Sequence, residues 1–227
     1  MEMKVNVMRR LVRGRVLLCA AFCILCSSTL KAQSPTAKEV FKAMPDSLLP
    51  YLSQNNRLDF IDFMESNMEA KVTNALNGKS EMTALSDRYL CLQLNEASRL
   101  QLRLLPVSTP VDSMNYIVCM VRTYGVEAQS SVVSFYSCLW RQLELTVDQL
   151  VTTDQLLVRP STMTNERFLE VRKILTPCFL QAELSPTDDI ISFSVSNPVV
   201  PQDDEIDVGN VKALMSFKWN GVKFNKL

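Results

Sequence analysis

Three stretches of the chain alternate apolar with polar side chains at a period of two. Their apolar members form the triplets Leu90, Leu92 and Leu94; Leu100, Leu102 and Leu104; and Ile191, Phe193 and Val195. Because successive side chains of a β-strand point to opposite faces of a sheet, each triplet predicts a strand with one buried face. Gln101 and Arg103 fall on the opposite face of the second strand. The pattern therefore predicts that this face meets solvent, as antiparallel hairpins allow.

Residues 116–124 depart from this alternation, because apolar side chains occupy both of their faces. Such a composition is typical of a central strand that is covered on both sides. Residues 178–184 carry three small or apolar residues on one face and predict one more strand.

Two further predicted strands, residues 130–140 and 211–219, each end in a tryptophan. Trp219 continues a series of inward residues, so we interpret it as core rather than as a platform for a carbohydrate or a peptide. The Asn220-Gly221 step that follows it predicts a tight hairpin, because both residues tolerate the positive φ of a type I′ turn.

Apolar residues recur at helical spacing in three segments, residues 36–44, 55–76 and 162–175. The predicted N-caps of the second and third segments are Asn55 or Asn56, and Thr164 or Asn165. We expect Asn77-Gly78 to end the second helix. Helices combined with antiparallel strands predict an α+β fold.

The two halves of the chain repeat one order of elements: helices, a hairpin with an inward triplet, a loop, and a strand that ends in tryptophan. We therefore predict two tandem helices-plus-sheet repeats, residues 33–145 and a shorter copy, residues 146–227. Two copies are too few for a solenoid. Joined edge to edge, they would form one extended antiparallel sheet with helices on one face, which removes exposed strand edges.

Residues 1–32 have the order of a secretory signal peptide. Five basic residues precede the apolar run Val16–Cys26, which is eleven residues long, and a small, polar stretch follows it. A helix needs about 20 residues to span a bilayer, so the run favours a cleaved leader over a membrane anchor. We expect a periplasmic or secreted mature chain without a transmembrane span.

Lipoprotein anchoring is the less favoured alternative. Cys19, Cys23 and Cys26 lie in or beside the apolar run, but a large residue precedes each of them. Acylated cysteines of bacterial lipoproteins follow a small residue, so we expect simple cleavage near Ala32 or Gln33.

The net charge of the mature chain bears on nucleic acid as a partner. The full sequence has 24 basic and 24 acidic residues, and removal of residues 1–32 takes away six basic and one acidic residue. The mature chain therefore has 18 basic and 23 acidic residues and a net charge of −5. A mildly acidic chain without a basic stripe argues against nucleic acid as a partner.

Four cysteines remain after cleavage: Cys91, Cys119, Cys138 and Cys178. In an oxidising compartment they could pair, and the predicted adjacent strands make Cys119 and Cys138 the first candidates. All four also lie inside apolar strand patterns, where an unpaired cysteine behaves as a small hydrophobe. The sequence favours unpaired cysteines and leaves the disulfide state open.

The chain has no histidine, which excludes Ser-His-Asp and Cys-His catalysis and imidazole metal sites. It contains no phosphate-binding or nucleophile-elbow motif. We therefore name no catalytic, cofactor-binding or metal residue and expect no cofactor.

The sequence contains two clusters of acidic residues. Asp188-Asp189 lies in a predicted turn, where aspartates usually bond their own backbone. Asp203–Asp207 imitates the start of a calcium loop, but Gly209 comes one place late and Leu214 stands where a bidentate Glu is needed. We interpret it as a solvated loop, and cation binding there stays open.

The runs MPDSLLPYLSQNNRLDFIDFMESNM and KSEMTALSDRYL, followed by the two tryptophan-ended strands, resemble an uncharacterised family of exported Bacteroidales proteins, a domain of unknown function. The resemblance covers the mature chain from about Ala37 onward. It implies export and carries over no functional residue. The doubled unit of helices and antiparallel sheet is also similar to the β-lactamase inhibitory protein and PepSY-like tandem repeats, by fold analogy alone.

Two function hypotheses follow. The favoured one is a non-enzymatic periplasmic or surface module, a binding or scaffold protein that contacts a protein or peptide through its sheet face. The alternative is a carboxylate-dependent enzyme acting on envelope glycans, which requires two carboxylates facing each other across a cleft, about 5–10 Å apart.

We predict that the chain recovered from the cell envelope begins at Gln33 or Ser34, because the apolar run directs export and the small, polar stretch is cleaved. Intact-mass measurement of the purified protein checks this. Replacing Leu18 with Arg interrupts the run and should leave full-length chain in the cytoplasm. An N-terminus at an acylated cysteine would contradict the prediction.

Overall fold

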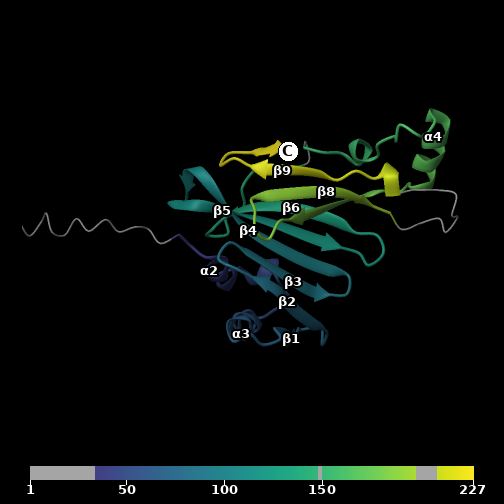
Figure 1. Cartoon of the computed structure of the whole chain (residues 1–227). Helices are drawn as coiled ribbons and strands as arrows, with labels where there is room; N and C mark the ends of the chain where they lie inside the picture. Colours follow the sequence, from purple (N-terminus) through teal and green to yellow (C-terminus); the bar gives the residue numbers. More distant parts are fainter. Residues whose placement is uncertain (1–33, 148–149, 198–208) are drawn as a thin grey trace, which may run out of the picture. The chain divides into compact units, whose positions relative to one another are not determined.

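The strands of the protein form two antiparallel sheets (Figure 1). The computed structural model describes residues 34–147, 150–197 and 209–227. The larger sheet contains, in order, β1 (Lys71–Thr73), β2 (Lys79–Leu85), β3 (Tyr89–Asn95), β4 (Ser98–Val111), β5 (Met114–Tyr124) and β6 (Ser130–Ser137). The smaller sheet contains, in order, β10 (Phe224–Lys226), β9 (Met215–Trp219), β8 (Ile190–Ser196) and β7 (Phe179–Leu184). The helices are α2 (Ala37–Lys42), α3 (Gln54–Glu65) and α4 (Asn165–Ile174), with 3-10 helices η1 (Asp46–Leu48), η2 (Thr153–Leu156) and η3 (Gly209–Val211). The predicted α+β fold is confirmed.

Helices α2 and α3 cover one face of the larger sheet. The inward leucines of β3 and β4 pack there against Phe41, Phe60 and Ile61, which are fully buried. Each helix begins at a capped residue: Thr36 accepts a hydrogen bond from Glu39 N, and Ser53 accepts one from Asn56 N. The caps fix where the helices start, and the apolar stripes fix which side meets the sheet.

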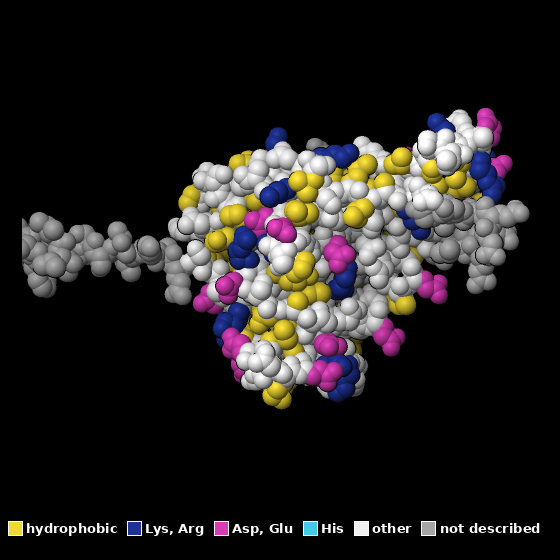
Figure 2. Space-filling view, in the orientation of Figure 1, with side chains coloured by type: hydrophobic (Ala, Val, Ile, Leu, Met, Phe, Trp, Pro, Cys, Tyr) yellow, Lys and Arg dark blue, Asp and Glu magenta, His cyan; other side chains and the backbone are white. Residues whose placement is uncertain are grey.

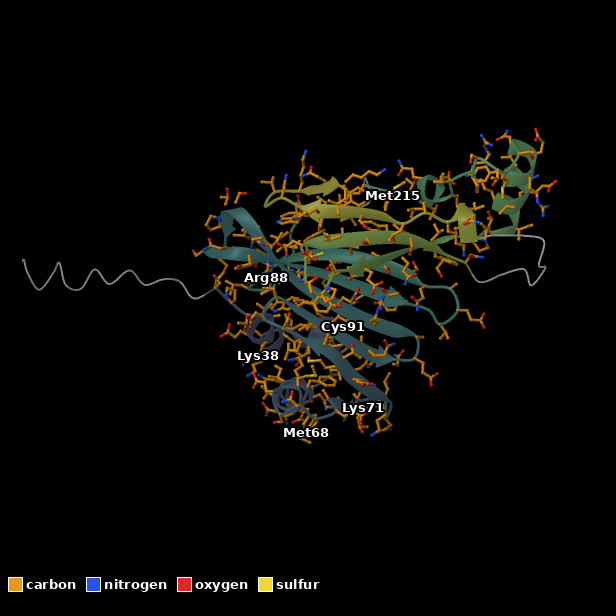
Figure 3. The ribbon with its side chains drawn as sticks, viewed as in Figure 1. Lys38, Met68, Lys71, Arg88, Cys91 and Met215 are labelled. Atoms are coloured by element: carbon orange, nitrogen blue, oxygen red, sulfur yellow. The ribbon has the colours of Figure 1, made fainter. Side chains whose placement is uncertain are left out.

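The smaller sheet covers the opposite face of the larger sheet. Cys119 and Phe135 of the larger sheet share one apolar core with Phe193 and Phe217 of the smaller one. In Figure 3, Lys38 and Met68 lie on the helical side of the larger sheet, and Met215 lies on the side of the smaller sheet. The larger sheet is therefore the middle of three layers and is buried on both faces.

This layering corrects one prediction from the sequence. The face of β4 that carries Gln101 and Arg103 does not meet solvent, because both side chains are buried beneath the smaller sheet, with 2% and 1% of their surface exposed. Gln101 donates to the Tyr89 hydroxyl at 2.9 Å and accepts from Leu184 N at 3.2 Å. The alternation of polar and apolar residues in β4 indicates a second buried interface at this place. Its polar side chains form hydrogen bonds within the protein.

The two sheets also do not join edge to edge into one extended sheet. Hydrogen-bonded pairing stops at β6 and resumes at β7, and the sheets stack instead. Leu102 and Phe193 are both buried on strands, but Leu102 faces the helices and Phe193 faces the larger sheet. The tandem-repeat interpretation and its boundary at residue 145 stay predictions. The described part of the chain belongs to one compact unit, Ser34–Leu227.

A buried ion pair connects the two sheets. Arg103 Nε donates to Asp189 Oδ1 at 3.0 Å, and Arg88 Nη1 lies 3.1 Å from both carboxylate oxygens of Asp189. The remaining guanidinium donors of Arg103 reach the carbonyl oxygens of Ser185, Pro186 and Thr187. The turn between β7 and β8 thus closes around the Arg103 side chain of β4.

The two tryptophans fasten the outer layers to the middle one. The Trp140 indole N–H donates to Val40 O of α2 at 2.9 Å, and the Trp219 indole N–H donates to Pro106 O of β4 at 2.6 Å. Both side chains are buried, which confirms the core interpretation of Trp219. Trp140 has a φ of 65°, a costly conformation for a bulky residue, which its indole bond and its packing against Tyr136 offset.

Three local expectations were wrong. The second helix ends at Glu65, and Asn77-Gly78 lies in the hairpin between β1 and β2 instead of ending a helix. Its N-cap is Ser53, not Asn55 or Asn56. The last hairpin forms at Asn220-Gly221, but positive φ occurs at Gly221 and not at Asn220, so the turn is not type I′. Asn220 Oδ1 instead accepts from Val222 N and Lys223 N.

The four cysteines of the mature chain are unpaired. Cys119 and Cys138, the first candidates for a disulfide, lie on opposite faces of the larger sheet: Cys119 faces the smaller sheet and Cys138 faces the helices. A bond between them would have to pass through the sheet, so this candidate pairing is wrong.

We predict that Asp189→Asn lowers the free energy of unfolding by about 2 kcal/mol, because it leaves the buried Arg103 charge without a counter-charge. Urea denaturation measures the loss. The matched control is Asp188→Asn in the same turn, whose carboxylate accepts locally from Thr187 Oγ1 and which should cost under about 0.5 kcal/mol. Equal losses in both variants would show that the ion pair does not hold the layers together.

Candidate functional site

A pocket formed by described residues lies on the helical face of the larger sheet, beyond the helices themselves. It has a volume of about 590 Å³. Residues 47–52, which run from η1 toward the start of α3, form one wall. The start of β2, the end of β3, the start of β4 and the end of β5 form the floor, and residues 74–76 close one side. We call this the strand-end pocket.

The wall is held by a buried arginine. Arg57 of α3 donates to Asp46 Oδ1 at 2.7 Å and to Leu52 O at 3.2 Å, so one side chain connects both ends of residues 46–52. Leu49 and Leu52 are buried beneath the segment and anchor it to the helical core. Tyr51 O also accepts from Ala75 N at 2.9 Å, which ties the wall to the adjoining hairpin.

Asn74 organises the side of the pocket. Its Oδ1 accepts from Leu76 N and Gly78 N at 3.0 and 3.1 Å, and its Nδ2 donates to Ser80 Oγ at 3.0 Å. The side chain is buried, and it replaces the backbone partners that a regular hairpin would supply. The pocket side is therefore a built turn and not a loose loop.

Arg122 brings the only charge among the pocket's lining residues. It lies near the end of β5, where Leu100 of β4 and Val132 of β6 are its cross-strand neighbours. Its Nε and Nη2 atoms are buried and have no hydrogen-bond partner within the described structure. No Asp or Glu of the described residues lines the pocket, so none of them neutralises the guanidinium there.

Exposed apolar side chains surround the opening. Tyr51, Leu76 and Tyr124 line the pocket with exposed fractions of 52%, 63% and 45%. Gly125 completes the rim where the chain turns from β5 to β6. Its φ is 112°, and a Cβ there would lie 1.9 Å from Ala128 O, so a side chain is not tolerated. The site combines an apolar rim with a charged floor.

The thiols and the buried phenol near the core are not activated. Burial raises the pKa of the Cys119 and Cys178 thiols, and burial together with the Asp112 charge raises the pKa of Cys138 to about 11. Burial likewise raises the pKa of Tyr89 to about 12. These groups are held protonated at neutral pH, whereas a catalytic thiol needs a lowered pKa.

The acidic clusters singled out in the sequence have separate outcomes. Asp188 makes local turn contacts as expected, but Asp189 binds Arg103 and Arg88, so its role as a local turn residue was wrong. Asp203–Asp207 lies outside the described residues. Within the described ranges, no group of three His, Cys, Asp or Glu side chains could hold a metal ion, and no helix is long and apolar enough to cross a bilayer.

The sequence did not single out the strand-end pocket. Residues 116–124 were interpreted as a covered central strand, and Arg122 is the one charged side chain in that strand. A charge inside an otherwise apolar strand was the available signal. This charge indicates a pocket only because residues 47–52 leave the end of β5 uncovered. The sequence of β5 carries no information about where residues 47–52 lie.

The comparisons with known proteins agree with an α+β fold of unassigned activity. The chain belongs to a family described as protein of unknown function (DUF3256), whose model matches residues 29–224. A similar solved structure is that of a domain of an uncharacterized protein from Porphyromonas gingivalis W83, with 18% identity, a TM-score of 0.66, and coverage of 86% of this chain and 99% of that one. No curated protein matches the chain.

We predict that Asn74→Ala lowers the free energy of unfolding by about 2 kcal/mol, because two backbone N–H groups and Ser80 lose their partner. Urea denaturation measures the change. The control is Asn225→Ala, an exposed position on β10, where we expect a loss below about 0.5 kcal/mol. If both variants lose the same small amount, Asn74 does not organise the pocket.

Proposed function

We propose that the mature chain is an exported, non-enzymatic binding module of the cell envelope, and that it takes its ligand in the strand-end pocket. Export is supported by the order of charges and apolar residues in the leader, residues 1–32. Binding is supported by one observation above all: an apolar-rimmed pocket with a single charge, Arg122, that nothing within the described structure neutralises.

The pocket is a better binding location than a sheet face. The helices and the smaller sheet cover both faces of the larger sheet, apart from the strand ends that line the pocket. The outward residues of β8 on the smaller sheet are polar, with Ser192, Ser194 and Ser196 in a row. Figure 2 shows charged side chains of both signs interspersed with hydrophobic ones over the face of the molecule in view. A volume near 590 Å³ falls in the range of small-ligand pockets, about 300–1,000 Å³. The ligand is therefore a small molecule or the end of a peptide.

A glycan-directed enzyme is the alternative. That chemistry needs one carboxylic acid and one carboxylate on either side of the scissile bond. The pocket lining contains neither Asp nor Glu, and the chain contains no histidine. The groups present can hold a ligand, but they offer no acid–base pair to cleave it.

We predict that small-molecule fragments bind the mature chain at the strand-end pocket. Chemical shifts of ¹⁵N-labelled protein should move at residues 47–52, 74–76 and 122–125 when a fragment set is added. Ser98→Trp fills the pocket floor and should abolish these shifts. The control Ser194→Trp, on the outer face of the smaller sheet, should leave them intact.

Two results would overturn the proposal. One is fragment binding that maps elsewhere, or that Ser98→Trp leaves unchanged in a folded protein. The other is release of sugars from purified peptidoglycan by the mature chain, which would favour the enzyme.

A further inference from the structure

Arg122 differs from the other arginines in the described ranges. Seven of them, Arg57, Arg88, Arg99, Arg103, Arg141, Arg167 and Arg172, form an ion pair with a carboxylate. Arg159 donates to the carbonyl oxygen of Met163. Arg122 has neither kind of partner, although two of its nitrogens are buried. Single nitrogens of Arg57 and Arg99 are also buried without a partner, but Arg122 is the one described arginine whose guanidinium forms neither an ion pair nor a hydrogen bond with the described residues.

A guanidinium cannot lose its charge to escape this position, because arginine stays protonated in proteins. Burial without a partner is unfavourable for any polar group and more so for a charged one. The lining of the pocket offers no carboxylate to relieve it. Since no described residue supplies an acceptor for these two nitrogens, a ligand that enters the pocket can supply one.

We infer that the strand-end pocket recognises a carboxylate attached to an apolar body, with Arg122 binding the carboxylate. This inference rests on the proposed binding function and names its ligand class. The planar fork of a guanidinium matches the two oxygens of a carboxylate. Arg122 is the only cation in the lining, so one positive charge faces the ligand, which suits a monoanion better than a phosphate dianion.

The rest of the pocket fits an apolar body. Tyr51 and Tyr124 both reach the opening and remain about half exposed, and Leu76 is exposed beside them. Aromatic side chains with one wet edge bury apolar ligand surface at low entropic cost. Ser98 on the floor carries a hydroxyl that can donate a further hydrogen bond to the ligand.

Two sources can supply this chemistry: a fatty acid, and the C-terminal residues of a peptide. Isothermal titration calorimetry of the mature chain separates them with two matched probe pairs. The first pair is decanoate and decanamide, and the second is N-acetyl-Leu-Phe with a free carboxylate and the same dipeptide as a C-terminal amide.

At least one carboxylate should bind, and its amide should bind at least tenfold more weakly. Arg122→Gln should weaken binding of that carboxylate at least tenfold, and Arg122→Lys should weaken it less. The control Arg159→Gln should leave the affinity unchanged. Without ligand, Arg122→Gln should melt at the same temperature as the wild-type chain or higher, because it removes an unsatisfied buried charge; this separates lost recognition from lost folding.

The outcomes separate the two proposals. If neutral fragments occupy the pocket but neither carboxylate binds, or acid and amide bind equally, the carboxylate inference is wrong and the binding function stands. If Arg122→Gln melts well below the wild-type chain, Arg122 is satisfied within the fold and the inference is wrong. If nothing binds the pocket at all, both proposals fail.

Discussion

Arg103 carries a positive charge into the interface between the two sheets, and Asp189 neutralises it there. Because Asp189 lies in the turn between β7 and β8, this pair fixes the smaller sheet against the middle of β4. Asp189 also holds β9, since its carbonyl oxygen accepts from Trp219 N at 2.8 Å. Buried ion pairs add little net stability, but they penalise every arrangement that separates the partners. We propose that the pair thereby favours the stacked sheets over arrangements of the same strands that separate Arg103 from Asp189.

The position of the pocket follows from this layering. With helices on one face of the larger sheet and the smaller sheet on the other, the strand ends beyond the helices are left to line the pocket. Arg103 and Arg122 differ in their surroundings, although both are arginines of the larger sheet. Arg103 points to the smaller sheet and meets a carboxylate of the chain, whereas Arg122 points to the helical face and meets no carboxylate of the described residues.

Much of the fold could be predicted from local pattern. The leucine triplets of β3 and β4 and the triplet of β8 are strands with buried faces, and α4 begins after its predicted cap, Thr164. These features depend on the spacing of apolar side chains and on helix capping, and a short segment of the sequence is enough to show both. The stacking of the sheets could not be predicted in this way. A polar residue such as Arg103 looks the same in a window whether it meets water or a distant aspartate.

The candidate site was beyond local pattern for a related reason. Asn74, Tyr51 and Arg122 come from separate parts of the chain, and none belongs to a motif. The Asn77-Gly78 step predicts a helix end from its position after a helical pattern, although Asn-Gly signals a hairpin equally well. The prediction therefore lacks β1 and β2, and with them the wall that they support. The sequence predicts the apolar character of β5. The Arg122 charge within β5 indicates a binding site only once the structure shows no described carboxylate beside it.

The most direct test is a crystal structure of the mature chain grown with the tighter-binding carboxylate probe at neutral pH. The account predicts ligand density in the strand-end pocket, with both carboxylate oxygens at hydrogen-bond distance, about 2.7–2.9 Å, from the Arg122 guanidinium and the apolar body between Tyr51 and Tyr124. Density for the probe at another surface, or an Arg122 side chain paired with a carboxylate of the protein itself, would contradict it.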